Sequence, residues 1–307
     1  MQSLSRHTEA SAPTGIFGTP LREAIAACHL GAMPETPLPE AQSSADVPLK
    51  ERPQLLQRAE ARAQYIPRIV TRSIESLEKW GVQEEGLYRI SGRSSHSSRL
   101  RALWDSPAMD LDMAAIAPAD LDVHAVCSVL KMYLRELPDP LLPKDVTQVF
   151  DRLCTEAAGG SPLTPDMQRQ LAPQLAPLMA QVPICEWYLL RELADHLGRL
   201  TEPATVERTK MPLSNLTLVL APTVQISVVT LMTVVQLRDV LFNDETRPAP
   251  DAALAHEVLE GDAYRQSTMA RGWRGADTPA SASRQIPSVK SVTDPDRPSL
   301  MSKPSAG

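Results

Sequence analysis

Apolar residues recur at steps of three and four along much of this chain, a spacing that places them on one face of an α-helix. The clearest instance lies between residues 123 and 137. Its apolar face consists of Val123, Val126, Cys127, Leu130, Leu134 and Leu137. A separate polar stripe with the same spacing consists of His124, Ser128, Lys131 and Arg135. Because the residue before a proline avoids the helical region, Pro138 is expected to end this amphipathic helix.

The same spacing, broken by proline and glycine, predicts further helices at about 17–27, 66–80, 94–104, 143–157, 164–181, 184–200, 211–221 and 226–242. Pro173 and Pro177 should kink or split the helix at 164–181, and Gly81 should follow the helix at 66–80 in the left-handed conformation. No alternating strand pattern is present. The predicted fold is all-α, a single bundle of about eight or nine helices with one core between about 16 and 245.

Three segments outside this core differ in composition. Residues 1–15 are small and polar and are predicted to form a flexible N-terminus. Residues 30–65 are predicted to be a largely mobile insertion that regains helix near Leu55–Ala63, and residues 246–307 a disordered tail. Such compositions offer too little large apolar surface to offset the entropy of ordering the chain.

Charge and cysteine spacing exclude several classes of function. The net charge of −6 argues against a nucleic-acid partner held by a general positive field. The four cysteines, Cys28, Cys127, Cys154 and Cys185, lack the spacing of a metal site or a disulfide framework. They are interpreted as free thiols in a reducing compartment. No GxxxxGK[ST] motif occurs, so no nucleotide site is expected in the chain itself.

One uncharged stretch has the length of a membrane span. The 27 positions between Lys210 and Arg238 carry no charge, and a spanning helix needs about 20 apolar residues. Several polar residues interrupt this stretch, however, and Pro222 and Gln225 divide it into two pieces of ordinary globular length. Two buried helices are therefore predicted, and no transmembrane segment.

A candidate for phosphate chemistry is Arg89, which lies between two glycines. Gly86 and Gly92 can adopt backbone angles closed to other residues and so shape a sharp exposed turn. Leu87 and Ile90 are expected to pack inward as anchors while the arginine projects. A guanidinium is always charged and presents a planar fork of donors suited to phosphate oxygens. The alternative interpretation is an ordinary solvated arginine on a surface turn.

Three further polar residues are candidates for partner binding. Lys131 and Arg135 are like charges one helical turn apart, opposite the apolar stripe, which fits either a solvated face or a face that meets a partner. Asn215 stands beside the apolar run Leu216–Leu220, where an amide should hydrogen-bond something. Its partner is either the backbone of this chain or another molecule.

The sequence resembles the RhoGAP domain, the GTPase-activating domain for Rho-family small GTPases. Three blocks carry the resemblance in the order that the family has them: Glu85–Gly92, Lys131–Leu142, and Lys210–Met211 with Asn215–Thr223. Phe17–Leu21 resembles the family's usual opening, and Asp122–His124 the lead into its central helix. The resemblance covers about 16–245, interrupted by 30–65, and the run Pro222–Leu231 is most similar to fungal members.

The chain departs from the family pattern at three positions around the third block. Ala221 stands where glycine is usual, Thr209 where asparagine commonly precedes Lys-Met, and Leu220 where phenylalanine is frequent. None of these departures removes a catalytic group of the family.

The resemblance implies a helical bundle and a donated arginine finger, which would be Arg89. Lys131 and Arg135 would contact the GTPase and brace the finger loop, whose shape depends on glycines at both ends. Asn215 would hydrogen-bond the GTPase near its switch regions, with Pro222 shaping that surface.

The expected function is that of a GTPase activator which binds a GTP-loaded Rho, Rac or Cdc42-type protein and ends its signal. No cofactor or metal of its own is expected, because GTP and magnesium would belong to the partner. The expected location is cytoplasmic, with recruitment to a membrane or cortex through the GTPase. The alternatives are a catalytically silent GTPase-binding adaptor of the same fold and a helical scaffold with no GTPase partner.

Overall fold

The computed structural model describes residues 15–30, 62, 64–106 and 109–249. The expected flexible N-terminus, the insertion with its helix and the disordered tail fall almost wholly outside these residues. The described part is all-helical and holds no strand, as the sequence predicts. Its two 3-10 helices are η1 (Gly81–Gln83) and η2 (Met113–Ala115), and its α-helices are α1 (Leu21–Leu30), α3 (Arg68–Lys79), α4 (Ser94–Trp104), α5 (Val123–Glu136), α6 (Lys144–Ala158), α7 (Pro165–Met179), α8 (Ile184–Leu200), α9 (Pro203–Thr209), α10 (Leu213–Val224), α11 (Val228–Gln236) and α12 (Arg238–Leu241).

Two differences raise the number of α-helices in the described part from the expected nine to eleven. The region predicted as one helix at 226–242 is divided into α11 and α12 at Leu237. The short helix α9 was not predicted, because only two of its residues, Thr205 and Thr209, are buried and both are polar. In contrast, α7 is a single helix that contains both Pro173 and Pro177, so these prolines do not split it.

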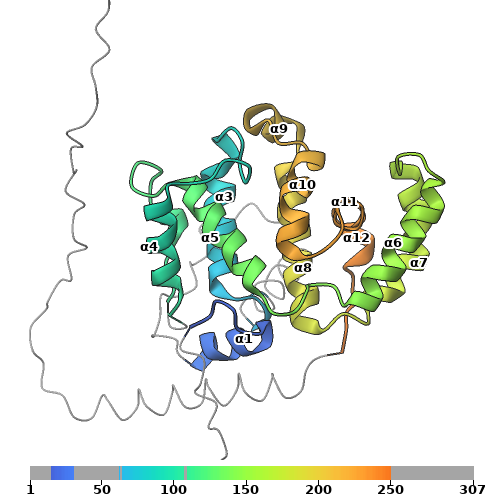
Figure 1. The fold of residues 1–307 in the computed structure, drawn as a ribbon, viewed down its shortest axis with the longest axis horizontal. Helices are drawn as coiled ribbons and strands as arrows, with labels where there is room; N and C mark the ends of the chain where they lie inside the picture. The colour runs from blue at the N-terminus through green and yellow to red at the C-terminus, as the bar shows by residue number, and fades with distance from the viewer. Residues whose placement is uncertain (1–14, 31–61, 63, 107–108, 250–307) are drawn as a thin grey trace, which may run out of the picture. The chain divides into compact units, whose positions relative to one another are not determined.

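Helix α5 lies at the centre of the part of the bundle that matters most below. It packs against α3, α4 and α10, and Figure 1 shows these helices gathered around it. Every member of its predicted apolar stripe is buried, from Val123 at its start to Leu137, which caps its end. Burying such a stripe against three helices is the main source of stability for a helix of this length. The backbone of α5 is therefore a rigid support for the polar side chains on its other face.

The remaining helices extend the core away from α5. Helix α8 packs against α1, α3, α11 and α12, while α6 and α7 pair with each other and meet α11 and α12. Buried side chains continue past the predicted domain boundary at 245 to Thr246 and Pro248. Thr246 donates its hydroxyl to the main-chain carbonyl of Leu241 at 2.7 Å, which ties this last turn to α12. All four cysteines are free and buried.

The uncharged stretch forms α10 and α11, as predicted from its internal breaks. Among the described residues, no single helix has the length and apolar character to cross a membrane, and α10 with α11 meets that criterion only as a pair bent by 116°.

Gly81 differs from expectation in its conformation. It is not left-handed: Trp80 caps α3, and Gly81 begins the 3-10 helix η1. A Cβ atom at this position would lie 2.9 Å from a methyl carbon of Leu87 and 3.3 Å from one of Val123. A glycine is needed at position 81 because η1 packs closely against α5 and against the segment after η1, which carries Leu87 and Arg89.

Candidate functional site: the Gly86–Gly92 loop and its supports

The loop between η1 and α4, Gly86–Gly92, has a strongly bent backbone. Gly86 has a φ of +71° and Tyr88 a φ of +66°, so a bulky residue also adopts the left-handed conformation. That conformation costs a non-glycine residue about 1–2 kcal/mol. The N–H groups of Arg89 and Ile90 both donate to the carbonyl of Gly86 at 2.9 Å and close the turn. The N–H of Gly86 donates to the carbonyl of Thr209 at 2.7 Å, which attaches the loop to the end of α9.

The inward anchors of the loop are Leu87 and Tyr88, each 1% exposed. The expectation for Leu87 is confirmed, but that for Ile90 is wrong: its side chain is 43% exposed. The reason is the left-handed backbone at Tyr88, which turns this aromatic ring inward and leaves Ile90 on the outside. The two glycines thus flank a turn whose interior is filled by an aromatic residue.

The far end of the loop is pressed against the first turn of α5. Unlike Gly86, Gly92 does not have a positive φ, so the special backbone angles expected for it are not the reason for glycine here. A Cβ atom on Gly92 would lie 2.2 Å from the main-chain nitrogen of Ala125, so only glycine fits. The N–H of Gly92 donates to the hydroxyl of Ser128 at 3.2 Å. Ser128 belongs to the predicted polar stripe of α5, and its contact is with the loop.

Asp122, the N-cap of α5, clamps the same end. Its carboxylate accepts the N–H of Arg93 and the N–H of His124, each at 3.0 Å. Burial alone would raise the pKa of Asp122, but these backbone donors outweigh it and lower the pKa below its ordinary value. The ionised carboxylate therefore joins the loop to the start of the helix.

Lys131 reaches the loop from the next turns of α5. Its ammonium donates to the main-chain carbonyl of Tyr88 at 2.5 Å. Partial burial, followed by repulsion from Arg135, lowers the pKa of Lys131. The guanidinium of Arg135 is exposed and makes no hydrogen bond or ion pair with any described residue.

Arg89 itself is exposed, and its side chain has no hydrogen bond or ion pair within the described ranges. One of its guanidinium nitrogens, Nη2, would lie 3.3 Å from a Cβ atom placed on Gly86, so the side chain passes over the start of its own loop. The backbone that carries this guanidinium is held at Thr209, at Lys131 and at Asp122.

A second exposed group lies on α10, which packs against α5. Asn215 and Pro222 are both exposed, and the amide of Asn215 hydrogen-bonds no other described residue, so the internal contact that we considered for it is not formed. Between them in sequence lies Leu218, which is 61% exposed. Residues at positions i, i+3 and i+7 share one side of a helix, so these three form one face. Sequence analysis missed Leu218 because a leucine within an apolar run is expected to be buried.

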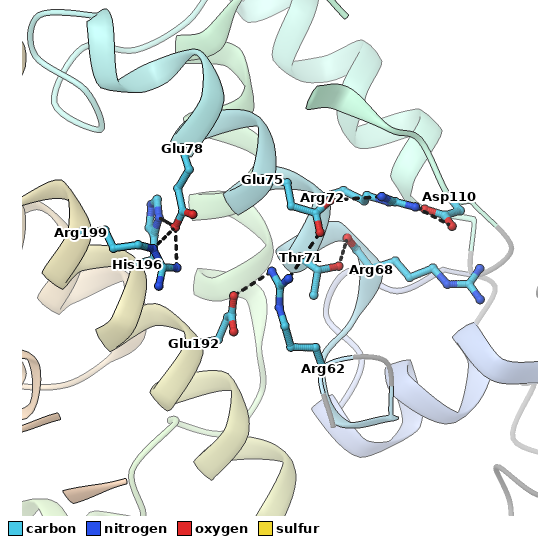
Figure 2. A network of polar contacts seen from close by, with 10 residues as sticks. All are labelled: Arg62, Arg68, Thr71, Arg72, Glu75, Glu78, Asp110, Glu192, His196 and Arg199. Atoms are coloured by element: carbon cyan, nitrogen blue, oxygen red, sulfur yellow. Dashed lines mark hydrogen bonds and ion pairs between the residues drawn. The ribbon is translucent and has the colours of Figure 1, made fainter. Parts of the chain in front are cut away.

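The loop also has a buried polar support that sequence analysis missed. The hydroxyl of Tyr88 lies 2.9 Å from Nε2 of His196 on α8, and Nδ1 of His196 lies 2.8 Å from a carboxylate oxygen of Glu78 on α3. Figure 2 shows Glu78 between His196 and Arg199, whose guanidinium donates to the same carboxylate oxygen at 2.6 Å. The chain of contacts thus runs from the protein surface to the base of the loop.

Burial and neighbouring charges set the protonation states of Glu78 and Tyr88. Burial alone would raise the pKa of Glu78, but His196 and Arg199 outweigh it and lower the pKa, so the carboxylate is ionised. Nδ1 of His196 is thus paired with an ionised carboxylate, and Nε2 is paired with the hydroxyl of Tyr88. Burial raises the pKa of Tyr88 well above its ordinary value, which keeps that hydroxyl protonated.

Other ion pairs in Figure 2 fix α3 in place. Arg72 of α3 bonds Asp110 at 2.7 Å, and Arg62 bonds Glu192 of α8 at 2.8 Å. Arg62 also bonds Glu75 of α3 at 3.5 Å, so these pairs support the position of α3, which carries Glu78.

The chain is similar in sequence to one domain that several known proteins contain. The sequence matches the RhoGAP domain over residues 67–227, just over half of the 307-residue chain. It is 33% identical over 165 residues to RalA-binding protein 1-A of Xenopus laevis, and 35% identical over 157 residues to Rho GTPase-activating protein gacY of Dictyostelium discoideum. Among solved structures, human Rho GTPase activating protein 15 matches with a TM-score of 0.45 and 20% identity, covering 78% of this chain and 94% of that one.

The similarity is that of one domain within longer proteins. The matched segments make up 53% and 51% of this chain but only 22% of RalA-binding protein 1-A and 20% of gacY. Because the family match covers more than half of the chain and contains the Gly86–Gly92 loop, α5 and the whole of α10, the chain belongs to the RhoGAP domain family.

Proposed function

We propose that this chain binds a GTP-loaded Rho-family GTPase and speeds GTP hydrolysis by inserting Arg89 into the partner's nucleotide site. The observation that carries the proposal is an exposed arginine without an ionic partner in the described chain, on a loop whose backbone is fixed at several points. The Dictyostelium relative is named a Rho GTPase-activating protein, which supports the same reaction.

The chemistry of phosphoryl transfer explains why a positioned arginine is sufficient. As the γ-phosphoryl group leaves, negative charge develops on its oxygens and on the oxygen that bridges the β- and γ-phosphates. A guanidinium placed there neutralises this charge, and such a finger accelerates turnover by about 10³- to 10⁵-fold, or roughly 4–7 kcal/mol of barrier. The nucleotide and its magnesium ion are supplied by the GTPase, so this chain needs neither for its part.

We assign different roles to the two cations of α5. Lys131 positions the loop, because its ammonium is directed at the carbonyl of the residue before Arg89. Arg135 projects outward from the next turn and contacts acidic or polar groups of the GTPase. The exposed face of α10, formed by Asn215, Leu218 and Pro222, provides the rest of the docking surface.

The direct test measures phosphate release and binding in parallel. The purified protein is mixed with GTP-loaded GTPases of the Rho, Rac and Cdc42 types, and the hydrolysis rate is compared with that of each GTPase alone. Stimulation of at least one of them supports the proposal. Binding without stimulation would favour a silent adaptor, and the absence of both would exclude a GTPase partner among the types tested.

A further inference from the structure

The loop that carries Arg89 is held from below by contacts that span three elements. Glu78 belongs to α3, His196 to α8 and Tyr88 to the loop, and Glu78 and His196 are 118 residues apart in the sequence. These contacts connect the core of the bundle to Tyr88, the residue directly before Arg89.

We propose that the hydrogen-bonded chain Glu78–His196–Tyr88 is a positioning device for Arg89, which holds the left-handed backbone of Tyr88 and thereby the direction of the arginine. This inference rests on the proposed function, because positioning has a consequence for rate only if Arg89 acts on a partner.

The backbone geometry gives the reason. Tyr88 has a φ of +66° and is the only non-glycine residue of the described Gly86–Gly92 loop with positive φ. A strained conformation of this kind persists only when its surroundings fix it. Here the ring is buried, the carbonyl accepts the ammonium of Lys131, and the hydroxyl bonds Nε2 of His196. If Tyr88 relaxed toward the ordinary region, the peptide that leads into Arg89 would rotate.

His196 is suited to this task because both of its ring nitrogens are engaged. Its side chain is completely buried, with Glu78 on one side and Tyr88 on the other. The Glu78 carboxylate pairs with Nδ1 and so fixes the orientation of the ring, with Nε2 directed at the Tyr88 hydroxyl. Arg199, which is itself partly exposed, secures Glu78 from the solvent side.

The chain offers a matched control in Tyr133, another fully buried tyrosine. Its hydroxyl has no hydrogen-bond partner among the described residues, and its ring packs edge-on against Phe17. Tyr88→Phe and Tyr133→Phe therefore remove the same atom from similar surroundings, but only the first removes a bond beneath the loop. His196→Asn removes the same bond from the other side, since the shorter amide replaces Nδ1 and leaves nothing at the position of Nε2.

The first measurement needs no GTPase. Amide hydrogen exchange is followed at Arg89 and Ile90, whose N–H groups donate to the carbonyl of Gly86. Losing one hydrogen bond beneath the loop should accelerate exchange about three- to tenfold in Tyr88→Phe and His196→Asn, and less than about twofold in Tyr133→Phe. Equal exchange in Tyr88→Phe and Tyr133→Phe would overturn the inference.

The second measurement separates positioning from general stability. With a stimulated GTPase, Tyr88→Phe should lower kcat about three- to tenfold while changing KM less than about twofold, and Tyr133→Phe should change neither. The double variant Tyr88→Phe/His196→Asn should be no slower than the slower single variant, because both remove one bond. Multiplying effects, or a rise in KM that accompanies a general loss of thermal stability, would show that the contact is merely structural and overturn the proposal.

The two proposals can fail separately. If the wild-type protein stimulates no GTPase, the proposed function fails, and the exchange measurement still decides whether the chain Glu78–His196–Tyr88 holds the loop. If stimulation is present but Tyr88→Phe behaves as Tyr133→Phe in both measurements, only the positioning inference fails.

Discussion

The Gly86–Gly92 loop and the exposed face of α10 present side chains to a partner by different physical means. The loop has a strained backbone that is fixed by Thr209, Lys131 and Asp122, among others. The face of α10 consists of Asn215, Leu218 and Pro222 on a helix whose opposite side is buried. A group that must meet a transferring phosphoryl needs a defined direction, whereas a docking surface needs only to be present and rigid.

This contrast separates two kinds of kinetic effect. Changes beneath the loop should lower the maximal rate of stimulated hydrolysis and leave binding nearly intact. Changes on α10 should weaken binding and leave the maximal rate intact. Each of the following changes tests one side of that comparison.

Apart from the removal of Arg89 itself, the largest effect is expected from Gly92→Ala. The added Cβ would lie 2.2 Å from the main-chain nitrogen of Ala125, so the loop must move away from α5. A displacement of about 1 Å at a catalytic group costs roughly 100-fold in rate, which is the loss of kcat that we expect. Gly159→Ala is the control: it has a φ of +54° but nothing within 4 Å, and it should lower stability by about 1 kcal/mol without changing kcat. A Gly92→Ala protein with normal kcat would contradict the role of close packing.

The next effect concerns Lys131→Met, which keeps the length of the side chain but removes the bond to the Tyr88 carbonyl. Charge-assisted hydrogen bonds contribute about 1.5–3 kcal/mol, so kcat should fall about tenfold or more. KM should change little if Lys131 positions the loop. Arg135→Met, one turn further along, should instead raise KM. The opposite pattern in the two variants would show that Lys131 docks the GTPase.

On the α10 side, Leu218→Asp should raise KM about tenfold and leave kcat within about twofold. The side chain is 61% exposed, so the change does little to the core but places a charge in an apolar contact. Val240→Asp on α12 is the matched control, since Val240 is also an exposed apolar residue, at 44%. Equal effects of the two variants would exclude Leu218 from the docking surface.

The smallest effect is one of stability and depends on pH. The pKa of Glu78 is lowered in the folded protein, so its carboxylate stabilises the fold above the pKa of the unfolded chain, about 4.3, and this contribution is lost as the pH falls through the folded pKa. Glu78→Gln should lower the free energy of unfolding by about 1 kcal/mol at pH 7, and the difference should shrink below about pH 4. Glu156→Gln, in an exposed pair with Arg152, should change it by less than about 0.5 kcal/mol. A deficit for Glu78→Gln that persisted unchanged at pH 3 would contradict this assignment.

Local patterns predicted the helices well where one apolar face is buried continuously. Helix α5 was expected at 123–137 and spans Val123–Glu136, and α4 was expected and found at residues 94–104. Short α9 escaped prediction because its buried residues are threonines, which carry no hydrophobic period. Gly81 was assigned a left-handed cap, whereas packing against Leu87 explains it.

The exposed candidates could be chosen from sequence, but their supports could not. Arg89, Lys131 and Arg135 stand in patterns that local reasoning and family resemblance both recognise. Ile90 was expected to be buried and Tyr88 was not considered, because nothing local indicates that Tyr88 adopts positive φ. His196 lies among apolar positions of α8, and its partner is 118 residues away. Contacts between such distant positions arise from the tertiary packing of helices.

The most direct test of the central claim is single-turnover GTP hydrolysis by a stimulated Rho-family GTPase with saturating wild-type protein or Arg89→Ala, with complex formation measured in the same samples. Arg89→Ala should lose about 10³-fold or more of the stimulated rate while its affinity for the GTPase changes by less than about threefold. Stimulation by Arg89→Ala within tenfold of the wild-type rate would contradict the claim that this guanidinium acts at the partner's phosphates.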